Sequence, residues 1–148
     1  MKSKLLARLE DPARSGTYRA ARTDEILDAL RGAGFDIARV DLAGASGKDA
    51  LLARFAAALA FPRWFGGNWD ALEDCLKDLG WRAQDRHVVL IEGFEALRTQ
   101  HPGDLDVLLD ILGSTAPYWR ERERPFFAVF IDPAHVIALP DLFRPKIT

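Results

Sequence analysis

The sequence predicts an α/β fold: a small sheet of three or four strands, mainly parallel, packed by helices. Segments with apolar residues at helical spacing alternate along the chain with short apolar runs. The runs 88–91 and 126–131 are continuously apolar, which is typical of strands covered on both faces. Strands separated by helices tend to pair in parallel, because the helix returns the chain to the same end of the sheet.

The composition fits one globular domain. Of the 148 residues, 49% are hydrophobic and 28% are charged, with a formal net charge of −2, which is ordinary for a folded domain. We expect a loosely docked arm over residues 1–15, the domain over 16–139 and a tail over 140–148. Cys75 is the single cysteine and no apolar run approaches the roughly 18 residues of a membrane span. We therefore expect no disulfide, no membrane contact and a cytoplasmic location.

The first half of the domain is predicted to contain two strands and two helices. We expect a short strand over residues 16–20 and a helix over 24–30, with Thr23 as its cap. Residues 35–42 alternate apolar and polar side chains, although imperfectly, and predict a strand. Residues 48–59 carry leucines and a phenylalanine on one helical face.

The second half continues the alternation of helices and strands. The predicted order is helix, strand, short helix, long helix and strand, over residues 69–79, 88–91, 94–99, 104–122 and 126–131. Gly80 is expected to end the first of these helices. The sequence His101-Pro102-Gly103 is expected to separate the two later helices.

The segment 62–81 is the most unusual part of the chain. It contains three tryptophans, four carboxylates and a pair of glycines. Gly66-Gly67 permits a turn. Asn68 is a favoured N-cap, because its side-chain oxygen can accept from the unpaired amides of a helix that begins at Trp69.

Three carboxylates, Asp70, Glu73 and Asp74, are spaced to share one face of this helix. Between residues 64 and 81, four acidic residues and Lys77 leave a net charge of −3, whereas the whole chain carries −2. Like charges at this spacing destabilise a helix by a few tenths of a kcal/mol per pair. Two explanations are open: an ordinary solvated acidic face, or a preformed anionic patch for a basic partner.

The run FPRWFGGNWDALEDCL, residues 61–76, resembles the barstar family of bacterial ribonuclease inhibitors. In that family an aromatic loop leads through Gly-x-Asn into a helix of the form x-Asp-Ala-Leu-x-Asp-Cys-Leu. The coarser resemblance covers about residues 36–132. It implies a three-stranded parallel sheet packed by helices, to which residues before Asp36 could add an edge strand. It also implies inhibition of a basic, extracellular-type ribonuclease through protein contacts, with no cofactor or metal.

The resemblance implies roles for individual residues. It places Asp74 in the nuclease active site, at the position of a substrate phosphate, and Asp70 against basic side chains. Trp64 falls where the family has a tyrosine that packs onto the enzyme. The remaining loop and helix-start positions implied at the interface are Gly66, Asn68 and Trp69.

Two features of the resemblance are less direct. The family also uses a glutamate on a later helix, for which Asp106 and Asp110 are the candidates, and we include Asp110 in the expected interface. Glu73 departs from the pattern, because the best-known member has a tryptophan there. We expect Glu73 to lie in the interface and to favour a partner with an extra basic group.

Other functions stay open beside inhibition. One is a barstar-like interaction domain whose partner is not a nuclease. Another is an enzyme that uses Asp70 and Asp74 as paired carboxylates, on a sugar or around a divalent cation. We expect no enzyme, because both side chains project from one short helix without facing carboxylates. The three histidines lack metal-ligand spacing, and an anionic patch repels nucleic acid.

Overall fold

The computed structural model describes residues 3–143 and confirms the predicted α/β fold. One four-stranded sheet has the order β1-β4-β3-β2 and is parallel throughout. The strands are β1 (Gly16–Ala20), β2 (Asp36–Asp41), β3 (His87–Glu92) and β4 (Phe126–Ile131). Strand β1 pairs with β4 at one edge, so the residues before Asp36 do add a strand.

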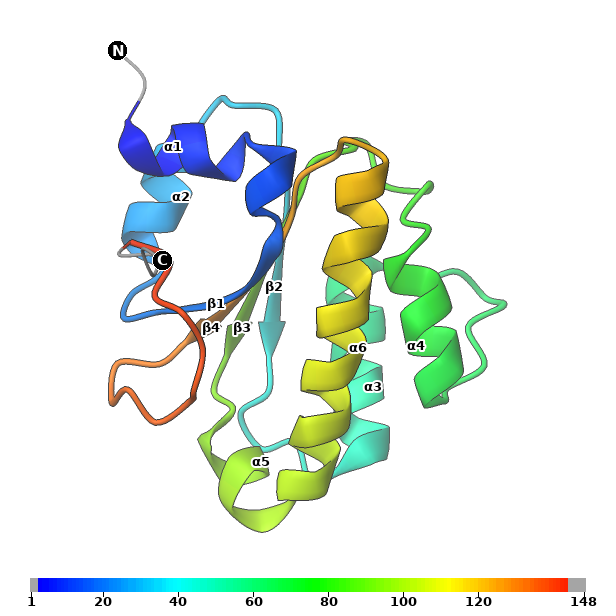
Figure 1. Ribbon diagram of the computed structural model, residues 1–148. Coiled ribbons are helices and arrows are strands. Elements are labelled where there is room, and N and C mark those ends of the chain that lie inside the picture. The colour runs from blue at the N-terminus through cyan, green and yellow to red at the C-terminus, as the bar shows by residue number, and fades with distance from the viewer. Residues whose placement is uncertain (1–2, 144–148) are drawn as a thin grey trace.

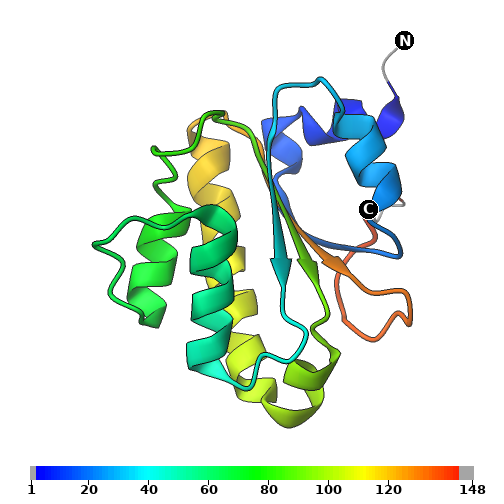
Figure 2. The same cartoon turned by 180° about the vertical axis from the view of Figure 1, so that it is seen from behind.

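Helices cover both faces of the sheet. They are α1 (Lys4–Leu9), α2 (Asp24–Leu30), α3 (Lys48–Leu59), α4 (Trp69–Leu76), α5 (Glu95–Gln100) and α6 (Pro102–Glu121), with a short 3-10 helix η1 (Pro12–Arg14). Helices α1 and α2 lie on one side of the sheet, and α3, α4 and α6 lie on the other (Figure 1 and, from behind, Figure 2). Among the helices of residues 3–143, none has the length and apolar character needed to cross a membrane.

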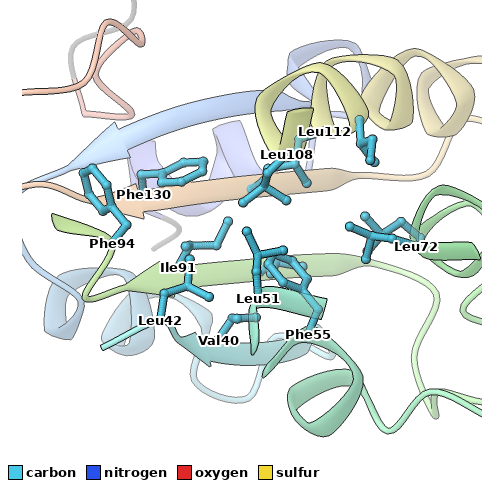
Figure 3. Packing of buried hydrophobic residues seen from close by; sticks show 14 of the residues in the cluster. Val40, Leu42, Leu51, Phe55, Leu72, Ile91, Phe94, Leu108, Leu112 and Phe130 are labelled. Atoms are coloured by element: carbon cyan, nitrogen blue, oxygen red, sulfur yellow. The ribbon is translucent and has the colours of Figure 1, made fainter. Parts of the chain in front are cut away.

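Two hydrophobic clusters hold these layers together, one on each face of the sheet. In the larger cluster, side chains of α3 and α6 meet those of the strands, and Leu72 of α4 joins them at one end (Figure 3). The labelled side chains are fully buried or nearly so. Burying a leucine or phenylalanine contributes about 1.5–3 kcal/mol, so this cluster fixes where α4 lies.

The N-terminal segment is not the loosely docked arm that we expected. Residues Lys4–Leu9 form α1, and Leu5 and Leu9 are buried in the smaller cluster. These leucines are four residues apart and therefore lie on one helical face. Ser3 caps the helix, its Oγ accepting from the amide of Leu6 at 3.0 Å.

The first part of the expected tail is also packed. Leu142 is fully buried, and its amide donates to the carbonyl of Arg19 in β1 at 2.9 Å. Residues 140–143 therefore lie along the outer edge of β1. Residues 144–148 of the expected tail lie outside the described residues.

Two details of the later helices differ from the prediction. Helix α6 begins at Pro102 rather than at Asp104, because proline fits the first turn of a helix, where no backbone donor is needed. Thr23 occupies the N-cap position of α2 but makes no capping hydrogen bond. Its hydroxyl donates instead to Glu92 of β3 at 3.2 Å.

A buried ion cluster joins β2, β3 and the segment after α4. Asp36 is only 8% exposed; Arg82 Nη2 donates to its Oδ1 at 2.7 Å, and His87 Nδ1 lies 2.9 Å from its Oδ2. Burial raises the pKa of Asp36, but the hydrogen bonds from His87 and Arg82 outweigh burial and hold the pKa below its usual range. The ring of His87 lies against Trp119 of α6, with centroids 5.2 Å apart.

Replacing Asp36 with asparagine is expected to lower the free energy of unfolding by about 3 kcal/mol, because Arg82 is left partly buried without its carboxylate. A folded pKa below the unfolded value stabilises the protein above the unfolded pKa, and this contribution is lost as pH falls through the folded pKa. The difference in the free energy of unfolding between wild type and variant should therefore reach its full value at pH 7 and decrease below about pH 4.

Urea unfolding of both proteins across a pH series measures this difference. The matched control is Asp28→Asn on α2, which removes an exposed carboxylate paired with Arg31 and should change stability by less than about 1 kcal/mol. An Asp36→Asn variant as stable as wild type at pH 7 would contradict the role given to the cluster.

Candidate functional site

The loop before α4 protrudes from the body of the molecule (Figure 1) and presents Trp64. This side chain is 56% exposed, which is unusual for a tryptophan. Its ring meets that of Trp81 edge to face, with centroids 6.0 Å apart. Phe61 packs on the same Trp81 ring at 6.0 Å. The Trp81 indole donates to the carbonyl of Leu59 at 2.9 Å, so Trp64 rests on a fixed aromatic support.

The turn and cap before α4 form as the sequence predicts. Gly67 has φ +69°, a backbone conformation that glycine adopts without strain. Asn68 is the N-cap, and its Oδ1 accepts from the amide of Ala71 at 2.8 Å. Gly66 and Asn68 are exposed, whereas Trp69 is half-buried and packs against the larger core cluster. Trp69 therefore offers only part of its surface to a partner.

Helix α4 ends at Leu76, three residues earlier than predicted. The residue that turns the chain is Leu79, with φ +55°, rather than Gly80. This strained conformation is offset by burial, because the Leu79 side chain is only 2% exposed and lies in the larger cluster. The amide of Gly80 donates to Asp78 Oδ1 at 3.0 Å.

The two faces of α4 differ in chemistry. Leu72, Cys75 and Leu76 are fully buried on the inner face. Burial, with smaller contributions from the charges of Asp78 and Asp74, raises the pKa of the Cys75 thiol to about 11. Cys75 is therefore a packing residue and carries no thiolate near neutral pH.

Three carboxylates lie on the exposed side of α4 and the turn after it: Asp70, Asp74 and Asp78. None of them forms an ion pair with another residue in the described range 3–143. The positive charges that would neutralise them must come from solvent ions or from a partner. We call these three residues the acidic patch.

Glu73 does not belong to the acidic patch, because its carboxylate has partners within the protein; its place in the interface stays a prediction. Its Oε2 accepts from Lys77 Nζ at 2.6 Å and from Ser114 Oγ of α6 at 3.2 Å. The hydrogen bond from Lys77 is the main reason why the pKa of Glu73 lies below its usual value. The hydrogen bond from Ser114 connects α4 to α6. Because Lys77 neutralises the charge of Glu73, this carboxylate needs no basic group from a partner.

Helix α6 runs beside α4 in the same direction. Glu73 meets Ser114, and further along both helices the Trp119 indole donates to the carbonyl of Leu76 at 2.9 Å. Asp110 is exposed and precedes Ser114 by one turn, which puts it level with the first turns of α4. Asp106 lies one turn further from this contact. Asp110 is thus the better placed of our two candidates.

Several residues of the site were not predicted. Lys77 and Ser114 brace α4, and Phe61 and Trp81 support Trp64. The clustering of aromatic residues between positions 61 and 81 was a signal that Phe61 and Trp81 could support Trp64. No local signal points to Ser114. Within residues 3–143, no three His, Cys, Asp or Glu side chains gather closely enough to hold a metal ion.

The fold and the site define a small parallel α/β domain that presents an acidic helix behind an aromatic loop. A family model described as Barstar (barnase inhibitor) matches residues 35–131. The match spans well over half of the chain, and the chain belongs to the barstar family, a family of inhibitors rather than enzymes. Among curated proteins no significant match is found. Elements α1, β1 and α2 precede the matched region.

Replacing Asn68 with alanine tests whether the cap holds the first turn of α4. The free energy of unfolding should fall by about 1 kcal/mol, because the amide of Ala71 loses its acceptor. Asn68→Ser is the matched control, since serine can accept the same hydrogen bond and should cost only a few tenths of a kcal/mol. Chemical denaturation of the three proteins gives both values, and equal losses in the two variants would disprove the capping role.

Proposed function

We propose that this protein inhibits a basic ribonuclease by inserting the acidic patch and Trp64 into the nuclease's substrate cleft. The observation that carries the proposal is the exposed Asp74 in the last turn of α4, which has no ion pair within residues 3–143, in a chain of the barstar family. A carboxylate in that position can replace a substrate phosphate among cationic side chains. Access of RNA is then blocked both sterically and electrostatically.

The arrangement of the site supports this mode of binding. Asp70 and Asp74 lie one turn apart on a helix whose inner face is fixed in the core, so little conformational freedom is lost when they bind. Trp64 offers a large apolar surface that is already held by Trp81. Aromatic anchors beside charged groups are typical of residues that dominate binding energy at interfaces.

The proposed partner is a basic protein of the extracellular nuclease type. Such an inhibitor protects the cytoplasm of the bacterial cell that makes the nuclease, which is where we place this protein. The intramolecular ion pair of Glu73 affects which nuclease this protein can bind. Where the best-known family member has a tryptophan, this chain has a carboxylate that is already neutralised by Lys77, so the partner needs no extra cation at that point.

Activity and binding assays distinguish inhibition from the two alternatives, an interaction domain and an enzyme. Purified protein is assayed for inhibition of barnase and of any basic nuclease captured from the secretions of the source organism. Inhibition at a ratio of one to one supports the proposal. Tight binding to a captured protein that has no nuclease activity would favour an interaction domain instead. Hydrolysis of a sugar or phosphate substrate that depends on Asp70 and Asp74 would favour an enzyme.

Replacing Asp74 with alanine should weaken nuclease binding by about 2 kcal/mol or more, because the cations it meets stay buried without a counter-charge. The fold should be kept, since Asp74 is exposed and unpaired within the described part of the chain. Calorimetric titration gives the affinity and a thermal melt checks the fold. Glu25→Ala, on the far side of the sheet, is the matched control, and equal affinities for the two variants would remove Asp74 from the interface.

The acidic patch should also steer the encounter with a basic partner. The association rate constant is expected to fall steeply as ionic strength rises, while the dissociation rate constant changes less. Stopped-flow measurements over a salt series give both constants. A triple variant with asparagine at positions 70, 74 and 78 should associate more slowly and with a flatter salt dependence. An unchanged slope would show that apolar contacts guide docking.

A further inference from the structure

A second charged surface lies at the N-terminal end of the chain, on the opposite side of the molecule from α4 (Figure 1). A pocket of about 320 Å³ is lined there by Lys4, Ala7, Arg8, Asp11 and Arg14. Lys4, Ala7 and Arg8 share the face of α1 that points away from the buried leucines. We call this pocket the basic pocket. All of its residues precede the region that matches the barstar family.

The charges of the basic pocket are not balanced. Within residues 3–143, Lys4 and Arg8 form no ion pair, although they are one turn apart and repel each other. Asp11 is the single lining carboxylate; it lies 3.9 Å from Arg14. Its Oδ1 also accepts from the amide of Ala13 at 3.0 Å, so Asp11 is already engaged as the cap of η1.

Two guanidinium groups, one in the basic pocket and one near it, donate to backbone carbonyls. Arg8 donates to the carbonyl of Leu142. Nearby, Arg120 of α6 donates to the carbonyl of Ser15 at 2.6 Å. Burial raises the pKa of Tyr18, and the charges of Arg14, Arg8 and Arg120 oppose that rise. A guanidinium has five N–H donors, so Arg8 and Arg14, which line the basic pocket, keep donors free for a ligand.

We propose that the basic pocket binds a small phosphate-bearing anion, with Lys4, Arg8 and Arg14 as its ligands. Guanidinium groups match the geometry of phosphate oxygens and can donate two hydrogen bonds to one phosphate. An anion with more than one negative charge suits three cations that line one pocket better than a single carboxylate does. The pocket volume lies at the lower end of the range for ligand sites, which favours a compact anion such as pyrophosphate over a strand of nucleic acid.

This site is independent of the proposed inhibition, because it shares no residue with the acidic patch and lies on another face. The probe is inorganic pyrophosphate, titrated calorimetrically at low salt. Wild type should bind one equivalent, and Lys4→Glu should bind about tenfold or more weakly. The Lys4 side chain makes no hydrogen bond within residues 3–143, and glutamate is favoured in the first turn of a helix, so this variant should fold. Arg14→Gln is a second variant that should weaken pyrophosphate binding.

The matched control is Lys48→Glu at the start of α3, which makes the same change in net charge away from the pocket. It should bind pyrophosphate as wild type does. Absence of saturable binding to wild type overturns the proposal, as does equal weakening in Lys4→Glu and Lys48→Glu, which would reflect net charge alone. Thermal melts of each variant confirm that the fold is intact.

Two further titrations distinguish the source of the phosphate. Adenosine diphosphate should bind about as well as pyrophosphate, because the two share a diphosphate group. A short oligouridylate offers only singly charged phosphodiesters and should bind more weakly. Stronger binding of the oligouridylate, with a steep dependence on salt, would overturn the compact-anion site in favour of a nucleic-acid surface.

Discussion

The need to cover both faces of one parallel sheet determines the rest of this structure. Strands β3 and β4 are buried on both sides, and a parallel sheet requires helices over each face. Helices α3 and α6 fill the larger face, and α4 packs at its edge through Leu72 and Leu76. Because that packing uses only one side of α4, its other side must face solvent, and the charged residues of the site occupy this side.

Helix α4 is held by more than its apolar face. Glu73 connects it to Lys77 and Ser114, Trp119 of α6 connects it to the core through Leu76, and the chain after it is tied to the sheet through Arg82 and Asp36. These contacts fix the helix without using Asp70 or Asp74. The residues that position α4 are thus distinct from the exposed carboxylates Asp70 and Asp74, and in the proposed inhibition this would keep the entropic cost of binding low.

Charge is distributed unevenly over the molecule. The acidic patch lies on α4 and the turn after it, while Lys4, Arg8 and Arg14 line a pocket around α1 and η1 on the opposite side. The net charge of −2 therefore does not reveal that the acidic patch and the basic pocket have local fields of opposite sign. In the proposed inhibition, such an arrangement would orient the molecule in the field of a basic partner before contact, with the acidic patch leading. The family match over residues 35–131 includes α4 but not α1 or η1.

The sequence by itself determined the α/β class, the order of most elements and the Asn68 cap, because periodicity and capping depend on residues a few positions apart. It also located the exposed carboxylates Asp70 and Asp74. Only the tertiary structure decided that Glu73 contacts Ser114 of α6, which is 41 residues away, and that residues 4–9 dock as a helix. Such outcomes depend on contacts across the core between elements that are distant in the sequence, and local sequence patterns do not reveal these contacts.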